Sequence, residues 1–288
     1  MRIRFGWMLP ALVCALGVAL SPPLWAQDKA ASPIAKAEIA KYDTAKQASL
    51  LKKQVAALPP QKPGVTDIYV IGVAGWASED VFRNELAGAL GVLGKALPLS
   101  GAIRLMNSPD SAKTLPLASR PNFAAAVRAL AGVMDREEDV LLVFMTSHGV
   151  PDSFALQLPA LLVRFTPQEF ATILRKAGIK NRVVIVSACF SGIFVKPLAT
   201  EDTIVLTASD AKSPSFGCAN GREWTYFGDA LFNHSLKPGT DFQRAYKGAQ
   251  KLINDWEKRD KLAPSNPQAH FGPALVSKLA PLFAAKAQ

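Results

Sequence analysis

Two reactive side chains, His148 and Cys189, each follow a continuously apolar run and lie within a few residues of a glycine. The runs are "VLLVFMTSHG" (140–149) and "VVIVSACFSG" (183–192). A thiol has an ordinary pKa of about 8.5 and is mostly protonated at neutral pH, so a nearby base is needed to activate it. A histidine can take that proton and later deliver one to a leaving amine. The pair therefore indicates nucleophilic catalysis at a carbonyl carbon.

Each of these residues also has a simpler interpretation. A buried cysteine on a strand is usually part of the core, and a histidine after a strand is usually only hydrogen bonded. Apart from Cys14, the other cysteine is Cys218, and a disulfide between it and Cys189 is a second alternative. We expect Cys218 to stay reduced and buried, because such a bond would silence the nucleophile. A zinc site would need three or four ligands, and Cys218, His234 and His270 have no ligand-like spacing.

Four continuously apolar runs predict the strands of a parallel sheet that is covered by helices on both faces. Besides the two runs above, they are "IYVIGVAG" (68–75) and "TIVLTASD" (203–210). The best-marked helix is "TPQEFATILRKAG" (166–178), in which Thr166 and Glu169 form a capping box and a glycine ends the helix. Alternating strands and helices over about 220 residues predict one α/β domain.

Other elements have weaker signals. Asn122 is expected to cap the helix of "NFAAAVRALAGVMD", and Thr240 with Gln243 to open an amphipathic helix through a second capping box. Residues 81–93 have an amphipathic pattern with Glu85 among the positions of the packed side. The runs "SFALQL" and "ALLVRF", separated by a proline, predict a small hairpin after the second strand.

His148 and Cys189 fall where open parallel sheets bind their ligands, beyond the carboxyl ends of the strands. They are 41 residues apart, which accommodates a hairpin, a helix and a strand, so their strands can be neighbours joined by a right-handed crossover. Neighbouring strands lie about 4.8 Å apart, and the two side chains can then face each other across a substrate carbonyl. The backbone N–H groups of Gly149 and Cys189 are candidates for stabilising the oxyanion.

Several of these segments resemble the legumain-type cysteine peptidases, in particular their shorter bacterial relatives. The segments are "VFMTSHG", "VVIVSACFSG", "SFGC" and "TYFGDALF", together with "GWASEDVF" and "LPLAS". The resemblance extends from about Asp67 to Trp256 and implies a caspase-like fold, which is a mostly parallel sheet flanked by helices on both faces. It also implies His148 as general base, Cys189 as nucleophile and Gly149 in the oxyanion hole of an endopeptidase that forms a thioester acyl-enzyme.

The specificity pocket departs from the family pattern. Where the family has an arginine, a histidine, a glutamate and an aspartate, this sequence has Asp80, Val81, Ser187 and Asp229. Ser215 completes the expected substrate-binding residues. Two carboxylates, Asp80 and Asp229, would favour a substrate with a lysine or arginine before the scissile bond. Alternatively, Asp80 caps the helix that starts at Val81, and the asparagine preference of the family is retained.

The N-terminus has the layout of a secretory signal peptide. In "MRIRFGWMLPALVCALGVALSPPLWAQD" two arginines precede an apolar run, and Ala26 offers a small residue for cleavage. The run is short for a membrane span, so we expect residues 1–26 to be removed, leaving a periplasmic or secreted protein without a stable span. Residues 27–63 are expected to be a mobile or cleavable arm and linker, and residues 64–288 the peptidase domain.

Charge and composition limit the classes of partner. Loss of Arg2 and Arg4 with the signal would lower the formal net charge from +10 to +8. The positive residues are scattered and not interleaved with aromatic ones, so we expect no nucleic-acid partner. The expected partner is a protein or peptide substrate, and no cofactor is implied. A transamidase, or a caspase-fold protein that binds cell-envelope partners without cleaving them, remains an alternative.

If the first segment is a signal peptide, sequencing the exported protein from its N-terminus should give a start at or near Gln27. The expected cause is cleavage after Ala26 by a peptidase that requires small residues near the cleaved bond. Expression with and without an export-blocking substitution in the apolar run provides the control. A mature protein that still carries Met1 would contradict this prediction.

Overall fold

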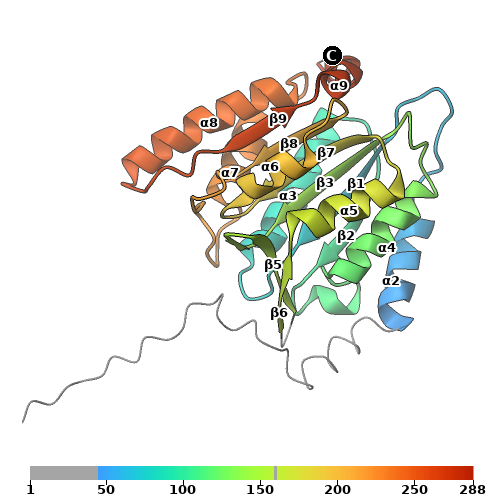
Figure 1. The fold of residues 1–288 in the computed structure, drawn as a ribbon, viewed down its shortest axis with the longest axis horizontal. Helices are drawn as coiled ribbons and strands as arrows, with labels where there is room; N and C mark the ends of the chain where they lie inside the picture. The colour runs from blue at the N-terminus through green and yellow to red at the C-terminus, as the bar shows by residue number, and fades with distance from the viewer. Residues whose placement is uncertain (1–44, 159–160, 288) are drawn as a thin grey trace, which may run out of the picture. The chain divides into compact units, whose positions relative to one another are not determined.

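The computed structural model describes residues 45–158 and 161–287. The expected signal peptide and the first part of the expected arm lie outside the described residues. A six-stranded sheet in the order β2-β1-β3-β7-β8-β9 forms the centre of the fold (Figure 1). Its strands are β1 (Ile68–Ala74), β2 (Leu99–Met106), β3 (Val140–Thr146), β7 (Asn181–Ser187), β8 (Thr203–Thr207) and β9 (Gln268–Phe271). All neighbours pair in parallel except β8 and β9, which are antiparallel.

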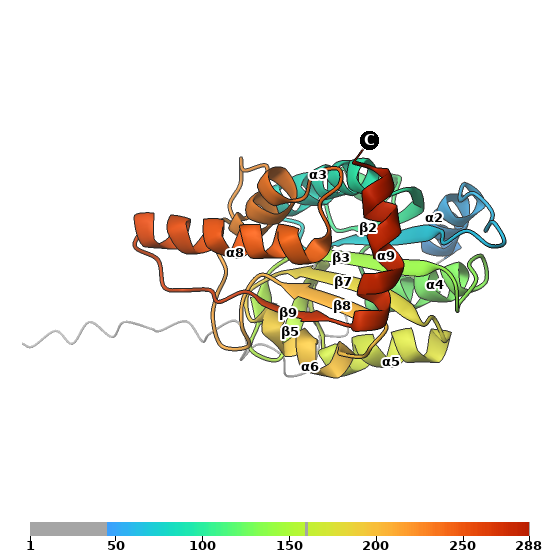
Figure 2. The same cartoon turned by 90° about the horizontal axis from the view of Figure 1, so that it is seen from above.

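Helices cover both faces of this sheet, as Figure 2 shows from above. One face carries α3 (Val81–Ala96), α8 (Phe242–Arg259) and α9 (Pro273–Ala285), and the other α4 (Arg120–Ala131), α5 (Pro167–Ala177) and α6 (Val195–Leu198). Each face has its own apolar core, because alternate residues of the buried strands point to opposite sides. The predicted α/β fold class, with a mostly parallel sheet between helices, is confirmed.

The four predicted strands are β1, β3, β7 and β8, which occupy the centre of the sheet. They are buried along almost their whole length, and this burial requires the continuous apolar runs. The two edge strands were not predicted. β2 contains serine, glycine and arginine and is only partly buried, and β9 has four residues. Edge strands need fewer apolar residues, so their sequences carry a weaker signal.

The local signals between β3 and β7 are confirmed. Thr166 and Glu169 form the predicted capping box of α5, and Gly178 ends this helix with a φ of 69°. The predicted hairpin consists of β5 (Ser153–Leu158) and β6 (Leu161–Phe165), and β5 also pairs with β4 (Gly149–Val150). The proline of its turn lies outside the described residues.

Two predicted helix caps were wrong. Ser119 caps α4 by accepting a hydrogen bond from the N–H of Asn122. The Asn122 side-chain amide instead donates to the Gln47 side-chain oxygen and to the Leu117 carbonyl, and the helix is capped by Ser119, three residues earlier. At α8, Asp241 caps the helix by accepting from Arg244 N–H, in place of the box expected at Thr240. An aspartate competes well for this position because its carboxylate also interacts favourably with the helix dipole.

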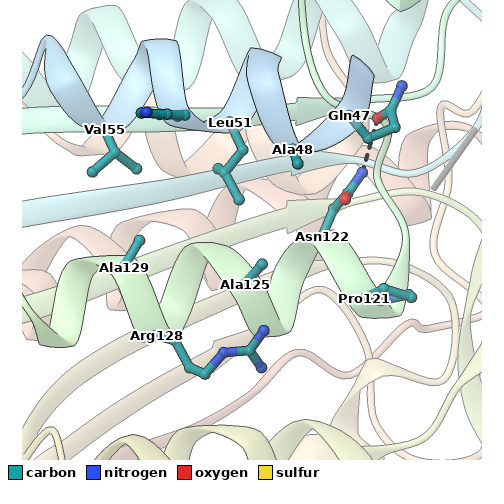
Figure 3. Close-up of a pocket in the computed structure, with 10 residues that line it drawn as sticks. Gln47, Ala48, Leu51, Val55, Pro121, Asn122, Ala125, Arg128 and Ala129 are labelled. Carbon is teal, nitrogen blue, oxygen red and sulfur yellow. Dashed lines mark hydrogen bonds between the residues drawn. The ribbon is translucent and has the colours of Figure 1, made fainter. Parts of the chain in front are cut away.

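A helix in the expected arm, α2 (Ala45–Ala56), packs against α4 (Figure 3). Gln47 is buried between the two helices, and its side-chain oxygen accepts hydrogen bonds from Leu117 N–H at 2.8 Å and from the Asn122 amide at 2.9 Å. The groove between α2 and α4 is lined largely by apolar side chains and the stems of longer ones. A buried amide with two partners is a specific attachment of α2 to the domain.

The same helix protects the exposed edge of the sheet. The Gln54 side chain accepts from Arg104 N–H at 2.8 Å and donates to Arg104 C=O at 3.0 Å, so it pairs with β2 as another strand would. Helix α2 is therefore packed on the domain, within the segment 27–63 for which a mobile or cleavable arm was expected. None of the helices in the part of the chain described here is long and apolar enough to cross a membrane.

If α2 is an integral part of the domain, Leu51→Ala should lower the free energy of unfolding by about 2 kcal/mol, because a buried side chain leaves a cavity. The measurement is urea denaturation followed by circular dichroism. Lys52→Ala changes the next residue, which is exposed, and should shift stability by less than about 0.5 kcal/mol. Equal denaturation midpoints for Leu51→Ala and the wild type would show that the helix contributes nothing.

Candidate active site

The ends of three neighbouring strands place the candidate residues together. Ala74 at the end of β1 pairs with Thr146 at the end of β3, and Thr146 pairs with Ser187 at the end of β7. His148 and Cys189 each lie two residues beyond this aligned row. The prediction that their strands are direct neighbours is confirmed, and both residues lie beyond the carboxyl ends of these strands.

Gly149 lies directly against the backbone of the cysteine. A Cβ atom at this position would be 1.9 Å from the Cys189 carbonyl oxygen, so only glycine allows the segments after β3 and β7 to approach this closely. The chain then turns sharply at Phe190, which has a φ of 58° and donates its N–H to the Ser213 carbonyl at 3.0 Å. A left-handed non-glycine residue is uncommon, and here it marks the turn that directly follows Cys189.

The Cys189 thiol contacts Ser215 from the loop after β8. Ser215 N–H donates to the sulfur atom at 3.2 Å, and the Ser215 hydroxyl oxygen is 3.8 Å from it. The sulfur also lies 3.5 Å from the Ser215 carbonyl oxygen, an acceptor suited to the neutral thiol. Ser215 can therefore stabilise both protonation states of the Cys189 side chain. Its N–H and hydroxyl can donate to a thiolate, and its carbonyl oxygen can accept from a protonated thiol.

His148 is held between two aromatic rings and a carboxylate. Its ring meets Trp76 edge-on at 4.6 Å between centroids and Phe82 at 5.1 Å. Its Nε2 atom lies 3.6 Å from Oε2 of Glu79. Burial lowers the pKa of His148 below its ordinary value of 6.5, and the charge of Glu79 opposes this shift. The imidazole is therefore neutral at neutral pH and available as a base.

The buried carboxyl group of Glu85, in α3, is hydrogen bonded to the last residues of β3 and β7. It accepts hydrogen bonds from the hydroxyl of Thr146, from Thr225 N–H at 3.3 Å, from the Thr225 hydroxyl and from the Ser187 hydroxyl at 3.4 Å. Burial raises the pKa of Glu85, and these hydrogen bonds oppose the shift. Gly228 is required here, since a Cβ atom would lie 1.8 Å from Oε1 of Glu85.

Ser187 stands where the resemblance expects a glutamate, and Glu85 supplies a carboxyl group to the same place from another element. Ser187 is buried and also lies 3.0 Å, hydroxyl to hydroxyl, from Thr225. The amphipathic pattern of residues 81–93 predicts that Glu85 lies on the packed side of its helix, but it indicates no role for the carboxyl group. The signal was present, because an acidic residue among buried apolar positions requires partners.

The two aspartates expected in the pocket have other partners. The Asp80 carboxylate accepts from Gly221 N–H at 2.8 Å, and Asp80 N–H donates to the Asn220 side chain at 2.9 Å, so Asp80 fastens the loop before α7 (Tyr226–Gly228). It makes no side-chain cap to α3 either. Asp229 accepts from the Asn233 amide at 2.8 Å and lies 3.5 Å from His234 of its own helix, η4 (Asp229–Ser235). Among the described residues, no hydrogen bond or ion pair joins these carboxylates.

Both described cysteines are free thiols. Cys218, which was expected to be buried, is only partly buried; it packs against the core cluster that includes residues of α3 and α8, and burial raises its pKa well above the ordinary value. This thiol therefore stays protonated and is a poor nucleophile. Within residues 45–158 and 161–287, no group of three or more His, Cys, Asp or Glu side chains is arranged to hold a metal ion.

The buried Glu85 predicts an unusual dependence of stability on pH. Its pKa is raised in the folded state above the ordinary 4.5, so the folded protein holds this proton more tightly than the unfolded chain does. The stabilisation is complete below pH 4.5 and is lost as the pH rises through the folded-state pKa. Glu85→Gln, which cannot ionise, should therefore lose less unfolding free energy than the wild type between about pH 5 and about pH 8.

Urea denaturation at both pH values measures this difference. The matched control is Glu223→Gln, which changes an exposed glutamate and should follow the wild type at each pH. If Glu85→Gln and the wild type change in parallel with pH, the carboxyl group does not retain its proton on folding.

A comparison with protein families identifies one match. The model of the Peptidase C13 family matches residues 122–271, which is just over half of the chain and includes β3, β7 and β8 with the segments that follow them. The match covers both His148 and Cys189. A search of curated proteins found no match.

Proposed function

Because the chain belongs to the Peptidase C13 family, the legumain family of cysteine peptidases, we propose that His148 and Cys189 are its catalytic dyad. The chain is a hydrolase of the cysteine-peptidase class, and its substrates are proteins or peptides. The observation that carries the dyad is the contact of Gly149 with the Cys189 carbonyl, which brings the segments bearing the two side chains together. The aligned ends of β3 and β7 support the same assignment.

The proposed reaction begins when His148 takes the proton of the Cys189 thiol. The sulfur then attacks the substrate carbonyl carbon, and negative charge develops on the carbonyl oxygen. The N–H groups of Gly149 and Cys189 are proposed to donate to this oxyanion. Collapse of the intermediate breaks the C–N bond, and the proton held by His148 passes to the leaving amine.

Water completes the cycle. The first product leaves as an amine, and the remaining acyl group is bound to Cys189 as a thioester. His148 is now neutral and can take a proton from a water molecule that attacks the thioester carbonyl. The second product leaves as a carboxylic acid, and the proton returns to the thiol. An amine in place of water would give a transamidation.

The location of this activity is also part of the proposal. Residues 1–26 have the order of charges, apolar residues and small cleavage residue that is typical of an exported protein. We infer that the peptidase acts in the periplasm or outside the cell. The catalytic domain then includes α2, because Gln47 and Gln54 attach it to α4 and β2.

Cys189→Ala and His148→Ala should each reduce peptide hydrolysis by several orders of magnitude, because the nucleophile and its base act as a unit. The measurement is cleavage of a mixed peptide library, with and without an added amine, followed by mass spectrometry. A peptide with a thiol-alkylating end group should label Cys189 alone, and the label should persist in Cys218→Ala. Substantial hydrolysis by Cys189→Ala would exclude the mechanism, and amine incorporation in place of hydrolysis would identify a transamidase.

A further inference from the structure

We propose that Glu79 is a third member of the catalytic arrangement, which positions His148 and stabilises its protonated form. This inference rests on the proposed function of His148 and deepens it. Glu79 lies in the segment after β1, five residues beyond Ala74, whose strand pairs with that of His148. The aligned strands thus supply three functional side chains from three successive strand ends.

The contact fixes which nitrogen of His148 can act as the base. Nε2 faces the Glu79 carboxylate at 3.6 Å, so the neutral ring carries its proton on Nε2 and leaves Nδ1 free to accept one. This separation is slightly longer than a hydrogen bond. Catalytic hydrogen bonds are often long before substrate binds and shorten when it is bound.

The carboxylate is also held by the neighbouring residue Ser78. The Ser78 hydroxyl donates to Oε2 of Glu79 at 3.0 Å, and the Ser78 oxygen accepts from the Trp76 indole N–H at 2.8 Å. Trp76 also packs edge-on against the ring of His148. The segment after β1 therefore contacts the imidazole both through an aromatic ring and through a carboxylate, which restricts the orientation of the ring.

The loop does not need Glu79 for its own structure. The Gln157 side-chain oxygen accepts from Ala77 N–H at 3.0 Å and from Ser78 N–H at 3.2 Å, and Gln157 N–H donates to Gly75 C=O at 2.8 Å. β5 thus holds the backbone that carries Glu79. Removal of the carboxylate should leave this scaffold in place, so its effect on His148 can be measured separately.

The electrostatic consequence concerns the step in which His148 becomes positively charged. Glu79 is the charged group that acts on this ring among the described residues, while α3 contributes Phe82 and the segment after β1 contributes Trp76, neither of which is charged. The other titratable group proposed to act with the ring is the Cys189 thiol. Burial opposes protonation of the imidazole, and the negative charge of Glu79 favours it. This charge would therefore assist the transfer of the proton from the thiol to His148.

The test compares Glu79→Gln and Glu79→Asp with the wild type, all as the full exported chain. Two quantities are measured: the His148 pKa, from NMR of the ring protons assigned with His148→Ala, and the kcat and KM for a peptide selected from the mixed library. Glu79→Gln should lower the His148 pKa, since the anion that favours imidazolium is lost, and should lower kcat by about tenfold or more with KM within about twofold. Glu79→Asp keeps the charge and should retain more of both properties.

The control is Glu137→Gln, which makes the same change at the opposite end of β3, where Glu137 pairs with Lys180; it should behave as the wild type. An unchanged His148 pKa in Glu79→Gln overturns the proposal. A variant that melts earlier and loses activity while His148 keeps its pKa would assign Glu79 a structural role and also overturn it. If the wild type cleaves no peptide, the proposed function fails, and the pKa comparison still decides whether Glu79 acts on His148.

Discussion

The register of three parallel strands is the constraint on which the candidate site depends. Ala74, Thr146 and Ser187 lie side by side at the ends of β1, β3 and β7. The segments that follow these three strands therefore all begin at the carboxyl end of the sheet. A slip of one residue in either pairing would turn the following side chains to the other face. The register is fixed by burial, because these strands are apolar and covered on both sides.

The reactive end of the sheet needs polar groups that the buried strands cannot supply, and neighbouring elements provide them. β5 contributes Gln157 to the segment after β1, and α3 contributes Glu85 to the ends of β3 and β7. The loop after β8 contributes Ser215, which contacts the Cys189 thiol. Of these groups Glu85 is buried, and its hydrogen bonds satisfy a carboxyl group that would otherwise be costly to bury. The site is therefore a product of the packing around the sheet as well as of the strand ends.

The sequence predicted the central strands and the neighbouring placement of His148 and Cys189, because both depend on local apolar runs and on the rules of parallel sheets. It did not predict the contacts of Glu79 or Glu85. Both glutamates contact residues that are distant in the sequence, and local sequence patterns do not predict such contacts. Asp80 illustrates the converse. Its position before α3 suggested a cap or a pocket, and its partner proved to be Gly221.

The two glutamates at this end of the sheet differ in environment, and this difference separates their roles. Glu79 is partly exposed, at 26% of its side chain, and has the imidazole of His148 as a potential cation. Glu85 is fully buried, has no cationic partner among its hydrogen bonds, and accepts only from hydroxyl and amide groups. Burial without a counter-charge favours the protonated carboxyl, whereas a nearby imidazolium favours the carboxylate. In the proposed mechanism Glu79 responds to positive charge on His148, whereas Glu85 has no counter-charge and links the ends of β3 and β7 through its hydrogen bonds to Thr146 and Ser187.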